Sequence, residues 1–127
     1  MQNVLIANSD IRQNVELCNY LTNDKIKAFG TTEGTLEKYY ELRPDIFILN
    51  TNLNYIEIID TLSFDKYEKR NCNTLLVSNS HNFPICVTNV AKIYKIFNEP
   101  KLQEISDTVV EMCNHTLEKD IDLLFLK

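Results

Sequence analysis

The residues of this sequence that could take part in binding or catalysis are polar side chains that directly follow short apolar runs. In chain order they are Asn8, Ser9, Asp10, Asn50, Ser78 and Glu99. If the apolar runs are parallel strands, these side chains meet at the carboxyl edge of one sheet, where open α/β proteins place their working groups. An amide, Asn50, follows the most apolar run, at the place where chemistry would be expected.

This set of side chains is poorly suited to metal binding or catalysis. Mg²⁺ is held mainly by carboxylate oxygens at about 2.1 Å, whereas Asn8, Ser9 and Asn50 are neutral. An amide cannot form an acyl phosphate, which requires a carboxylate nucleophile. The first turn, residues 7–12, contains no glycine and so lacks a phosphate-binding or dinucleotide-binding loop. We therefore expect no enzyme activity, no bound metal and no cofactor.

The elements that position these residues are five short apolar runs, which predict strands. They lie at residues 3–7, 25–29, 46–49, 74–78 and 93–97. The run 46–49 is apolar at every position, which is typical of a central strand covered by helices on both faces. It is entered through Pro44 and Asp45, and Pro44 prevents the preceding helix from continuing.

Helical spacing of apolar residues predicts five helical segments between and after these strands. They lie at residues 11–23, 33–42, 55–62, 85–91 and from 100 onward. The inward residues expected for the first segment are Ile11, Val15, Cys18 and Leu21. Those expected for the second are Leu36, Tyr39 and Tyr40. Those expected for the last are Leu102, Ile105, Val109, Met112 and Leu117.

Alternating strands and helices predict an α/β fold, a flavodoxin-like doubly wound sheet of five parallel strands in the order 2-1-3-4-5. The predicted domain covers residues 1–119. The apolar segment 120–127 is expected to be either an extension of the last helix or the start of a linker or output domain, because its apolar side chains would be costly to expose.

Composition excludes several classes of protein. The 127 residues are 44% hydrophobic and 24% charged, as in an ordinary globular domain. A net charge of -5 with scattered basic residues argues against a nucleic-acid surface in this domain. The four cysteines are widely spaced, so neither a disulfide framework nor a zinc site is expected. No segment is typical of a signal peptide or membrane span, and we expect a cytoplasmic protein without membrane contact.

Four short motifs occur in a familiar order along the chain. They are Val4–Asp10, Pro44–Asn50, Thr74–Ser78 and Ile96–Pro100. Together they resemble the receiver domain of two-component response regulators, the CheY-like signalling domain, over residues 2–118. This resemblance implies a role in signal transduction. If residues 123–126 begin a second domain, the resemblance implies that the chain is the N-terminal regulatory part of a transcription regulator, whose C-terminal output domain most often binds DNA in this family.

The functional positions of the receiver family are replaced here. In the family, an acidic pair and an aspartate hold Mg²⁺, that aspartate accepts a phosphoryl group, and a lysine pairs with it. Asn8 and Ser9 match the acidic pair, Asn50 matches the aspartate, and Glu99 matches the lysine. Ser78 matches the family's hydroxyl residue, and Asp10 is the one carboxylate left at the first loop. The resemblance thus implies a degenerate pseudo-receiver that signals without phosphorylation.

Function is then expected to reside in protein contacts. By resemblance, the interface lies on the face of helix four, strand five and helix five, residues 85–117, and binds either a protein partner or a second copy. Candidate interface residues are Tyr94, Lys95 and Phe97, with core packing as the alternative for the apolar ones. Two other functions remain open: a stand-alone adaptor or anti-regulator that binds a kinase or regulator, and a small-ligand-binding domain using Asp10, Ser78 and Glu99.

Overall fold

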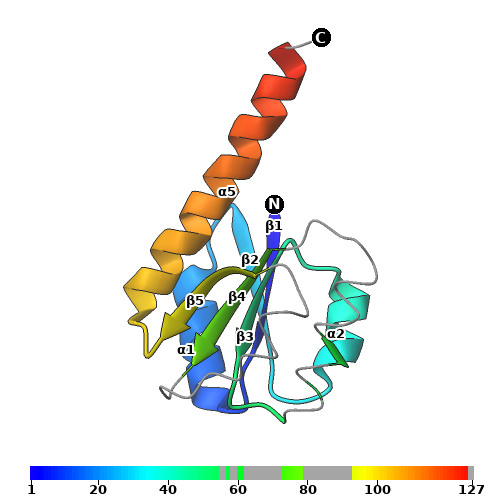
Figure 1. The fold of residues 1–127 in the computed structure, drawn as a ribbon, viewed down its shortest axis with the longest axis vertical. Coiled ribbons are helices and arrows are strands. Elements are labelled where there is room, and N and C mark those ends of the chain that lie inside the picture. The colour runs from blue at the N-terminus through cyan, green and yellow to red at the C-terminus, as the bar shows by residue number, and fades with distance from the viewer. Residues whose placement is uncertain (55–56, 58–59, 62–72, 79–92, 126–127) are drawn as a thin grey trace.

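A parallel sheet of five strands forms the centre of the molecule (Figure 1). The computed structural model describes residues 1–54, 57, 60–61, 73–78 and 93–125. Its strands are β1 (Gln2–Ala7), β2 (Ile26–Thr31), β3 (Ile46–Asn50), β4 (Asn73–Ser78) and β5 (Ile93–Asn98). The strand order is β2-β1-β3-β4-β5. The predicted fold class is therefore confirmed, and each predicted strand is present with ends shifted by at most two residues.

Helices cover both faces of the sheet. The helices are α1 (Ile11–Leu21), α2 (Thr35–Leu42) and α5 (Leu102–Phe125). Helices α1 and α5 pack on one face and α2 packs on the other (Figure 1). The helices predicted at 55–62 and 85–91 lie mainly outside the described residues.

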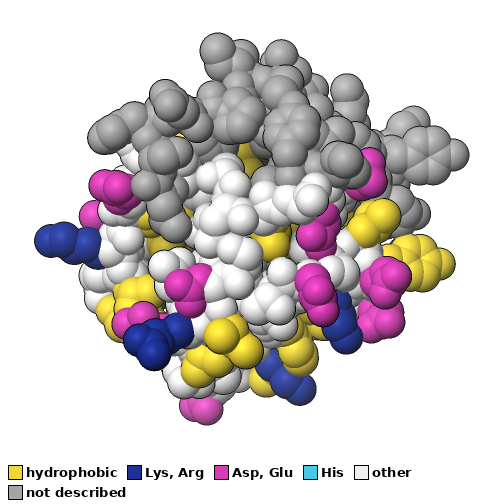
Figure 2. All heavy atoms as spheres, turned by 90° about the horizontal axis from the view of Figure 1, so that it is seen from below, with side chains coloured by type: hydrophobic (Ala, Val, Ile, Leu, Met, Phe, Trp, Pro, Cys, Tyr) yellow, Lys and Arg dark blue, Asp and Glu magenta, His cyan; other side chains and the backbone are white. Residues whose placement is uncertain are grey.

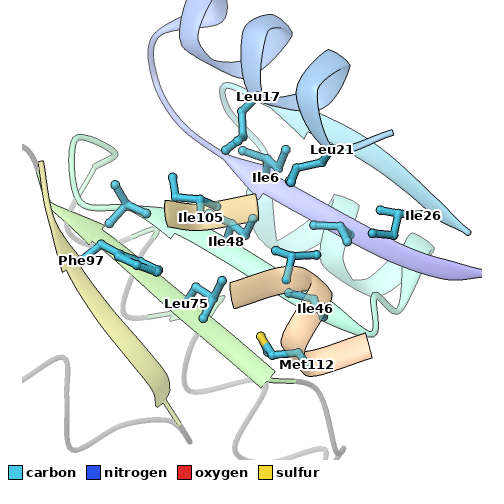
Figure 3. Packing of buried hydrophobic residues seen from close by; sticks show 13 residues of the cluster. Ile6, Leu17, Leu21, Ile26, Ile46, Ile48, Leu75, Phe97, Ile105 and Met112 are labelled. Atoms are coloured by element: carbon cyan, nitrogen blue, oxygen red, sulfur yellow. The ribbon is translucent and has the colours of Figure 1, made fainter. Parts of the chain in front are cut away.

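The larger core lies between the sheet and the helices α1 and α5. Figure 3 shows side chains from both helices and from the strands of the sheet pointing toward one another in this layer. They include Ile6, Leu17, Ile48, Leu75, Phe97 and Ile105. A smaller cluster on the other face surrounds Tyr39, which is fully buried and makes an edge-on ring contact with Phe47 at 5.2 Å between centroids. Burial on both faces explains why β3 has no polar position before Asn50.

The predicted buried face of α1 is wrong at two positions. Ile11 and Val15 are 69% and 54% exposed, whereas Asn14, Leu17 and Leu21 are buried. The helix is turned so that the polar Asn14 faces the sheet, because its Nδ2 donates to the carbonyl oxygens of Asn8 and Thr31 at 2.8 and 2.9 Å. Hydrogen bonds to two backbone carbonyls thus outweigh the exposure of two apolar side chains.

Helix α2 begins later than predicted and buries fewer aromatic rings. Gly34, with a φ of 63°, occupies the position before Thr35, and this left-handed conformation suits glycine. Tyr39 is buried as expected, but Tyr40 is 54% exposed and lies under the Arg43 guanidinium. The expectation that both tyrosines point inward is therefore corrected for Tyr40.

Helix α5 is longer than the sheet that it covers. Ile105, Val109 and Met112 are buried on the sheet, as predicted. The helix then continues past the amino edge of the sheet to Phe125 (Figure 1). Residues 120–125 are therefore helical, while the domain boundary at 119 stays a prediction. Within the described residues, no helix is long and apolar enough to span a membrane.

Candidate functional site

The strand register brings the predicted site residues to one edge of the sheet. Ala7 pairs with Leu49, and Asn50 pairs with Val77, so the segments after β1, β3 and β4 leave the sheet side by side. Asn8, Asn50 and Ser78 are 6%, 4% and 1% exposed, respectively. The predicted convergence of these three positions is therefore present in the fold.

The centre of the site is a network of amide hydrogen bonds. The Oδ1 atom of Asn8 accepts from the Nδ2 of Asn52 at 2.7 Å and from the backbone N–H of Asp10 at 2.8 Å. The Oδ1 of Asn52 accepts from the backbone N–H of Ser9 at 2.9 Å. The Oδ1 of Asn50 accepts from the backbone N–H of Asn52 at 3.0 Å. Neutral groups thus join the loop after β1 to the loop after β3.

Asn52 is the residue of this network that sequence reasoning missed. We expected Asn8 and Asn50 at the site, but the two side chains are connected through Asn52. The available signal was the pattern of two asparagines separated by one residue, because an Asn side chain often bonds the backbone N–H two residues later. That pattern predicts a local turn, but not the contact with Asn8.

Asp10, the one carboxylate in the first loop, acts as the N-cap of α1. Its Oδ1 accepts from the backbone N–H groups of Arg12 and Gln13 at 2.9 and 3.2 Å. A side-chain acceptor at this position satisfies N–H groups that have no partner within the helix. The carboxylate is thereby used for helix capping, which leaves the amides of Asn8 and Asn50 at the centre of the site.

Glu99 lies on the outside of the site. It is exposed and has a φ of 49°, a left-handed conformation that is uncommon for residues other than glycine. Its backbone N–H donates to the carbonyl oxygen of Ser78 at 2.7 Å, which fixes the loop after β5 to the end of β4. Its main-chain role is therefore structural, and a carboxylate stands at the position that resembles the family's lysine.

A pocket of about 340 Å³ lies beside the amide network, between α1 and α5. Its floor is formed by apolar side chains of both helices and three strands: Ile6, Leu17, Ile48, Val77, Leu102 and Ile105. Its polar lining residues are Asn8, Gln13, Glu16, Asn50 and Lys101, of which Gln13, Glu16 and Lys101 are exposed. The edge of the sheet is therefore hollowed on the α1/α5 side.

The acidic side chains that the structure describes do not converge on one point of this edge. Figure 2, which views the molecule from the carboxyl edge, shows them spread over the face. Among the described residues, no group of three or more His, Cys, Asp or Glu side chains is arranged to hold a metal ion. The described part of the site therefore offers mostly neutral oxygen ligands, which suit Mg²⁺ poorly.

The predicted interface residues on β5 do not all lie on the surface. Tyr94 is 41% exposed, and its hydroxyl donates to Glu111 of α5 at 3.4 Å. Lys95 is exposed and its Nζ lies 5.0 Å from the centre of the Phe97 ring. Phe97 itself is only 5% exposed and belongs to the α1/α5 core. Phe97 as an interface residue is thus corrected to a core residue.

The sheet order and the polar loops at its carboxyl edge place the chain in the flavodoxin-like class of α/β domains. The chain matches no protein-family model and no curated protein sequence. Among solved structures, it is similar in fold to the receiver domains of response regulators.

Three of these similar structures cover nearly the whole chain. The signal receiver domain of a Luxo repressor protein from Vibrio parahaemolyticus has a TM-score of 0.77 and 12% identity, covering 94% of this chain and 95% of that one. The response regulator TrrA from Thermotoga maritima, in complex with Mg²⁺ and BeF, has a TM-score of 0.74 and 14% identity, covering 88% and 99%. A Francisella response regulator receiver domain has a TM-score of 0.73 and 14% identity, covering 91% and 99%. At these identities, the likeness establishes the fold.

Proposed function

We propose that this chain is a pseudo-receiver that takes part in signal transduction without being phosphorylated. The observation that carries the proposal is the amide network in which Asn52 connects Asn8 to Asn50. In the receiver family that the fold resembles, carboxylates at such positions hold Mg²⁺ and accept a phosphoryl group. Here the network provides an amide in place of the nucleophile and joins the two loops without a metal ion.

The electrostatics of the edge support the same proposal. Glu99 stands where the resemblance places a lysine, and a carboxylate there repels an incoming phosphoryl group. Asp10, the nearest carboxylate in sequence, is already hydrogen-bonded to two backbone N–H groups of α1. A phosphoryl group transferred to Asp10 would remove that helix cap, so it is a poor substitute for the acceptor.

Incubation of the chain with acetyl phosphate and Mg²⁺, followed by intact-mass and peptide mass spectrometry, tests the proposal. We expect no phosphorylated species, and we expect Asn50→Asp alone to remain unmodified because the metal ligands are still missing. The positive control is the variant Asn8→Asp, Ser9→Asp, Asn50→Asp, Glu99→Lys, which restores the family's residue types. A stable acyl phosphate on the unaltered chain, at Asp10 or elsewhere, would overturn the proposal.

Signalling by such a domain requires contacts with another protein, and we propose that these involve the exposed side of β5 and α5. Tyr94 and Ile96 of β5 and Val110 of α5 are 41%, 46% and 44% exposed, so these two elements offer apolar side chains to a partner. Ile96→Lys should weaken association with a second copy or with a partner protein. Ile11→Lys, on α1 at 69% exposure, is the matched control. Sedimentation equilibrium measures self-association, and equal behaviour of the two variants would contradict this interface.

The chain is further proposed to be the regulatory part of a transcription regulator, with stand-alone adaptor or anti-regulator as the alternative. A similar fold occurs in a DNA-binding response regulator of the LuxR family from Staphylococcus aureus. The long helix α5, which leaves the domain at the amino edge of the sheet, is suited to connect it to a following segment. Removal of residues 120–127 should leave the domain folded, as measured by circular dichroism; a collapse in stability would favour a self-contained adaptor.

A further inference from the structure

The pocket between α1 and α5 has the size and lining of a small-molecule site. Its volume of about 340 Å³ lies at the lower end of the range for ligand pockets, which are mostly apolar with a few polar groups. Figure 3 shows four of its floor residues, Ile6, Leu17, Ile48 and Ile105, pointing toward one another from two strands and two helices. The apolar floor would contact an apolar portion of a ligand.

A buried amide supplies a hydrogen-bond donor to this pocket. Asn50 is 4% exposed and lines the pocket. Its Oδ1 accepts from the N–H of Asn52 at 3.0 Å, and its Nδ2 is the donor group of the same side chain. The Nδ2 group can therefore donate to an acceptor in the pocket, such as a carboxylate oxygen of a ligand.

Two opposite charges stand at the mouth of the pocket. Lys101 precedes the first turn of α5, and Glu16 projects from α1; both line the pocket. Within the part of the chain that the structure describes, neither has an ion-pair partner. The amino end of α5 carries partial positive charge, which adds to that of Lys101 and favours an anionic group on the same side.

We propose that this pocket binds a small zwitterion with an apolar body, that is, an amino acid with an apolar side chain. Its carboxylate would accept from Asn50 Nδ2 and Lys101 Nζ, and its ammonium group would face Glu16. Its side chain would lie against Ile48 and Ile105 on the pocket floor. A carboxylic acid without the ammonium group lacks a partner for Glu16, and an amine without the carboxylate lacks one for Lys101.

This inference goes beyond the proposed signalling role and does not depend on it. Binding is therefore measured without acetyl phosphate or Mg²⁺, so that its outcome and that of the phosphorylation assay are independent. The probe is L-leucine, titrated into the full chain by isothermal calorimetry and thermal denaturation. The comparison molecules are 4-methylpentanoate, isopentylamine and glycine, which lack the ammonium group, the carboxylate and the apolar body, respectively. We expect saturable binding and stabilisation with leucine, and at least tenfold weaker binding of each comparison molecule.

Substitutions at the pocket mouth test the assignment of each charge. Lys101→Met should weaken leucine binding about tenfold, the effect of losing one partly screened charge pair and its hydrogen bond. Glu16→Gln should weaken leucine binding but leave 4-methylpentanoate unchanged or improved. Lys38→Met, on α2, removes an exposed lysine outside the pocket and is the matched control. The substituted side chain is exposed in each variant, so each variant should fold. A denaturation curve of each variant checks this.

The proposal has two clear ways to fail. Absence of saturable leucine binding, while the denaturation curve shows a folded chain, overturns it. Leucine binding that is equally strong in the chain with Lys101→Met, Glu16→Gln and Lys38→Met overturns it as well, because the site then lies elsewhere.

Discussion

The side-chain amide of Asn52 donates to the Oδ1 of Asn8 at 2.7 Å, across 44 residues of sequence. The same residue binds the backbone N–H of Ser9 through its Oδ1 and donates its own N–H to Asn50. One side chain therefore joins the loops that follow β1 and β3. In a receiver fold, such loops surround the position where a phosphoryl group would bind, and here the hydrogen bonds of Asn52 that join them are between neutral groups.

Replacement of Asn52 by Ala should loosen this edge of the sheet. The change removes the bonds to Asn8 and Ser9, and we expect the free energy of unfolding to fall by about 1–2 kcal/mol. Urea denaturation measures the loss, and amide hydrogen exchange should become faster at Ser9. The control is Asn19→Ala, at an exposed position of α1, where a better helix former replaces Asn. An equal effect of the two substitutions would contradict the bridging role of Asn52.

Replacement of Asn14 tests why α1 buries a polar residue. Asn14→Ala loses two hydrogen bonds to backbone carbonyl oxygens, and about 2 kcal/mol of stability is expected to be lost. Asn14→Asp should be more destabilising, because it places an acceptor against the carbonyl oxygens of Asn8 and Thr31. Thermal and urea denaturation give the order of the two variants. The opposite order would mean that the donor role assigned to Nδ2 is wrong.

A side chain at Gly30 would press against two residues of α1, Asn14 and Cys18. A Cβ atom there would lie 3.3 Å from atoms of Asn14 and from the Sγ of Cys18. Gly30→Ala is expected to cost about 1–3 kcal/mol from overpacking. In a Cys18→Ala background the added cost should be smaller, because the sulfur atom is gone. A double-mutant cycle by urea denaturation measures this coupling, and strictly additive effects would exclude the contact.

The thiols of Cys18 and Cys113 should make the folded protein less stable at alkaline pH. Burial raises the pKa of Cys18 above the ordinary thiol value of 9.0, and burial followed by the charge of Asp45 raises that of Cys113. The folded state therefore holds these protons more tightly than the unfolded state does. Their contribution to stability is complete below pH 9 and is lost as the pH rises through the folded pKa values.

Urea denaturation at a series of pH values between about 8 and 11 measures this dependence. We expect the free energy of unfolding to fall more steeply with pH in the unaltered chain than in the variant Cys18→Ala, Cys113→Ala. Parallel curves would show that neither thiol has a raised pKa in the folded protein.

The apolar runs of the sequence predicted the sheet well because strands buried on both faces need apolar side chains at nearly every position. β3 and β4 illustrate this: Ile46–Leu49 and Leu75–Val77 are all buried. The order of the polar residues after each run then predicted correctly that Asn8, Asn50 and Ser78 share one edge. These features follow from local pattern and from the connection rules of α/β folds.

Predictions from the sequence were wrong or incomplete where hydrogen bonds determine the local structure. Apolar spacing placed Ile11 and Val15 on the buried face of α1, but the bonds of Asn14 to backbone carbonyls set the rotation of the helix. The same limit applies to Asn52, whose contact with Asn8 depends on the distance between two loops. From the sequence alone, Asp10 could be either a helix cap or a site residue. Its two hydrogen bonds to backbone N–H groups of α1 show that it caps this helix.

The most direct measurement of the central claim is a Mg²⁺ titration of the ¹⁵N-labelled chain followed by NMR. The loops after β1 and β3 are held by amides, so the backbone signals of Ser9, Asp10 and Asn52 should show no saturable shift, whereas the variant Asn8→Asp, Ser9→Asp, Asn50→Asp should show one. Saturable shifts of these signals in the unaltered chain at millimolar Mg²⁺ would contradict the account.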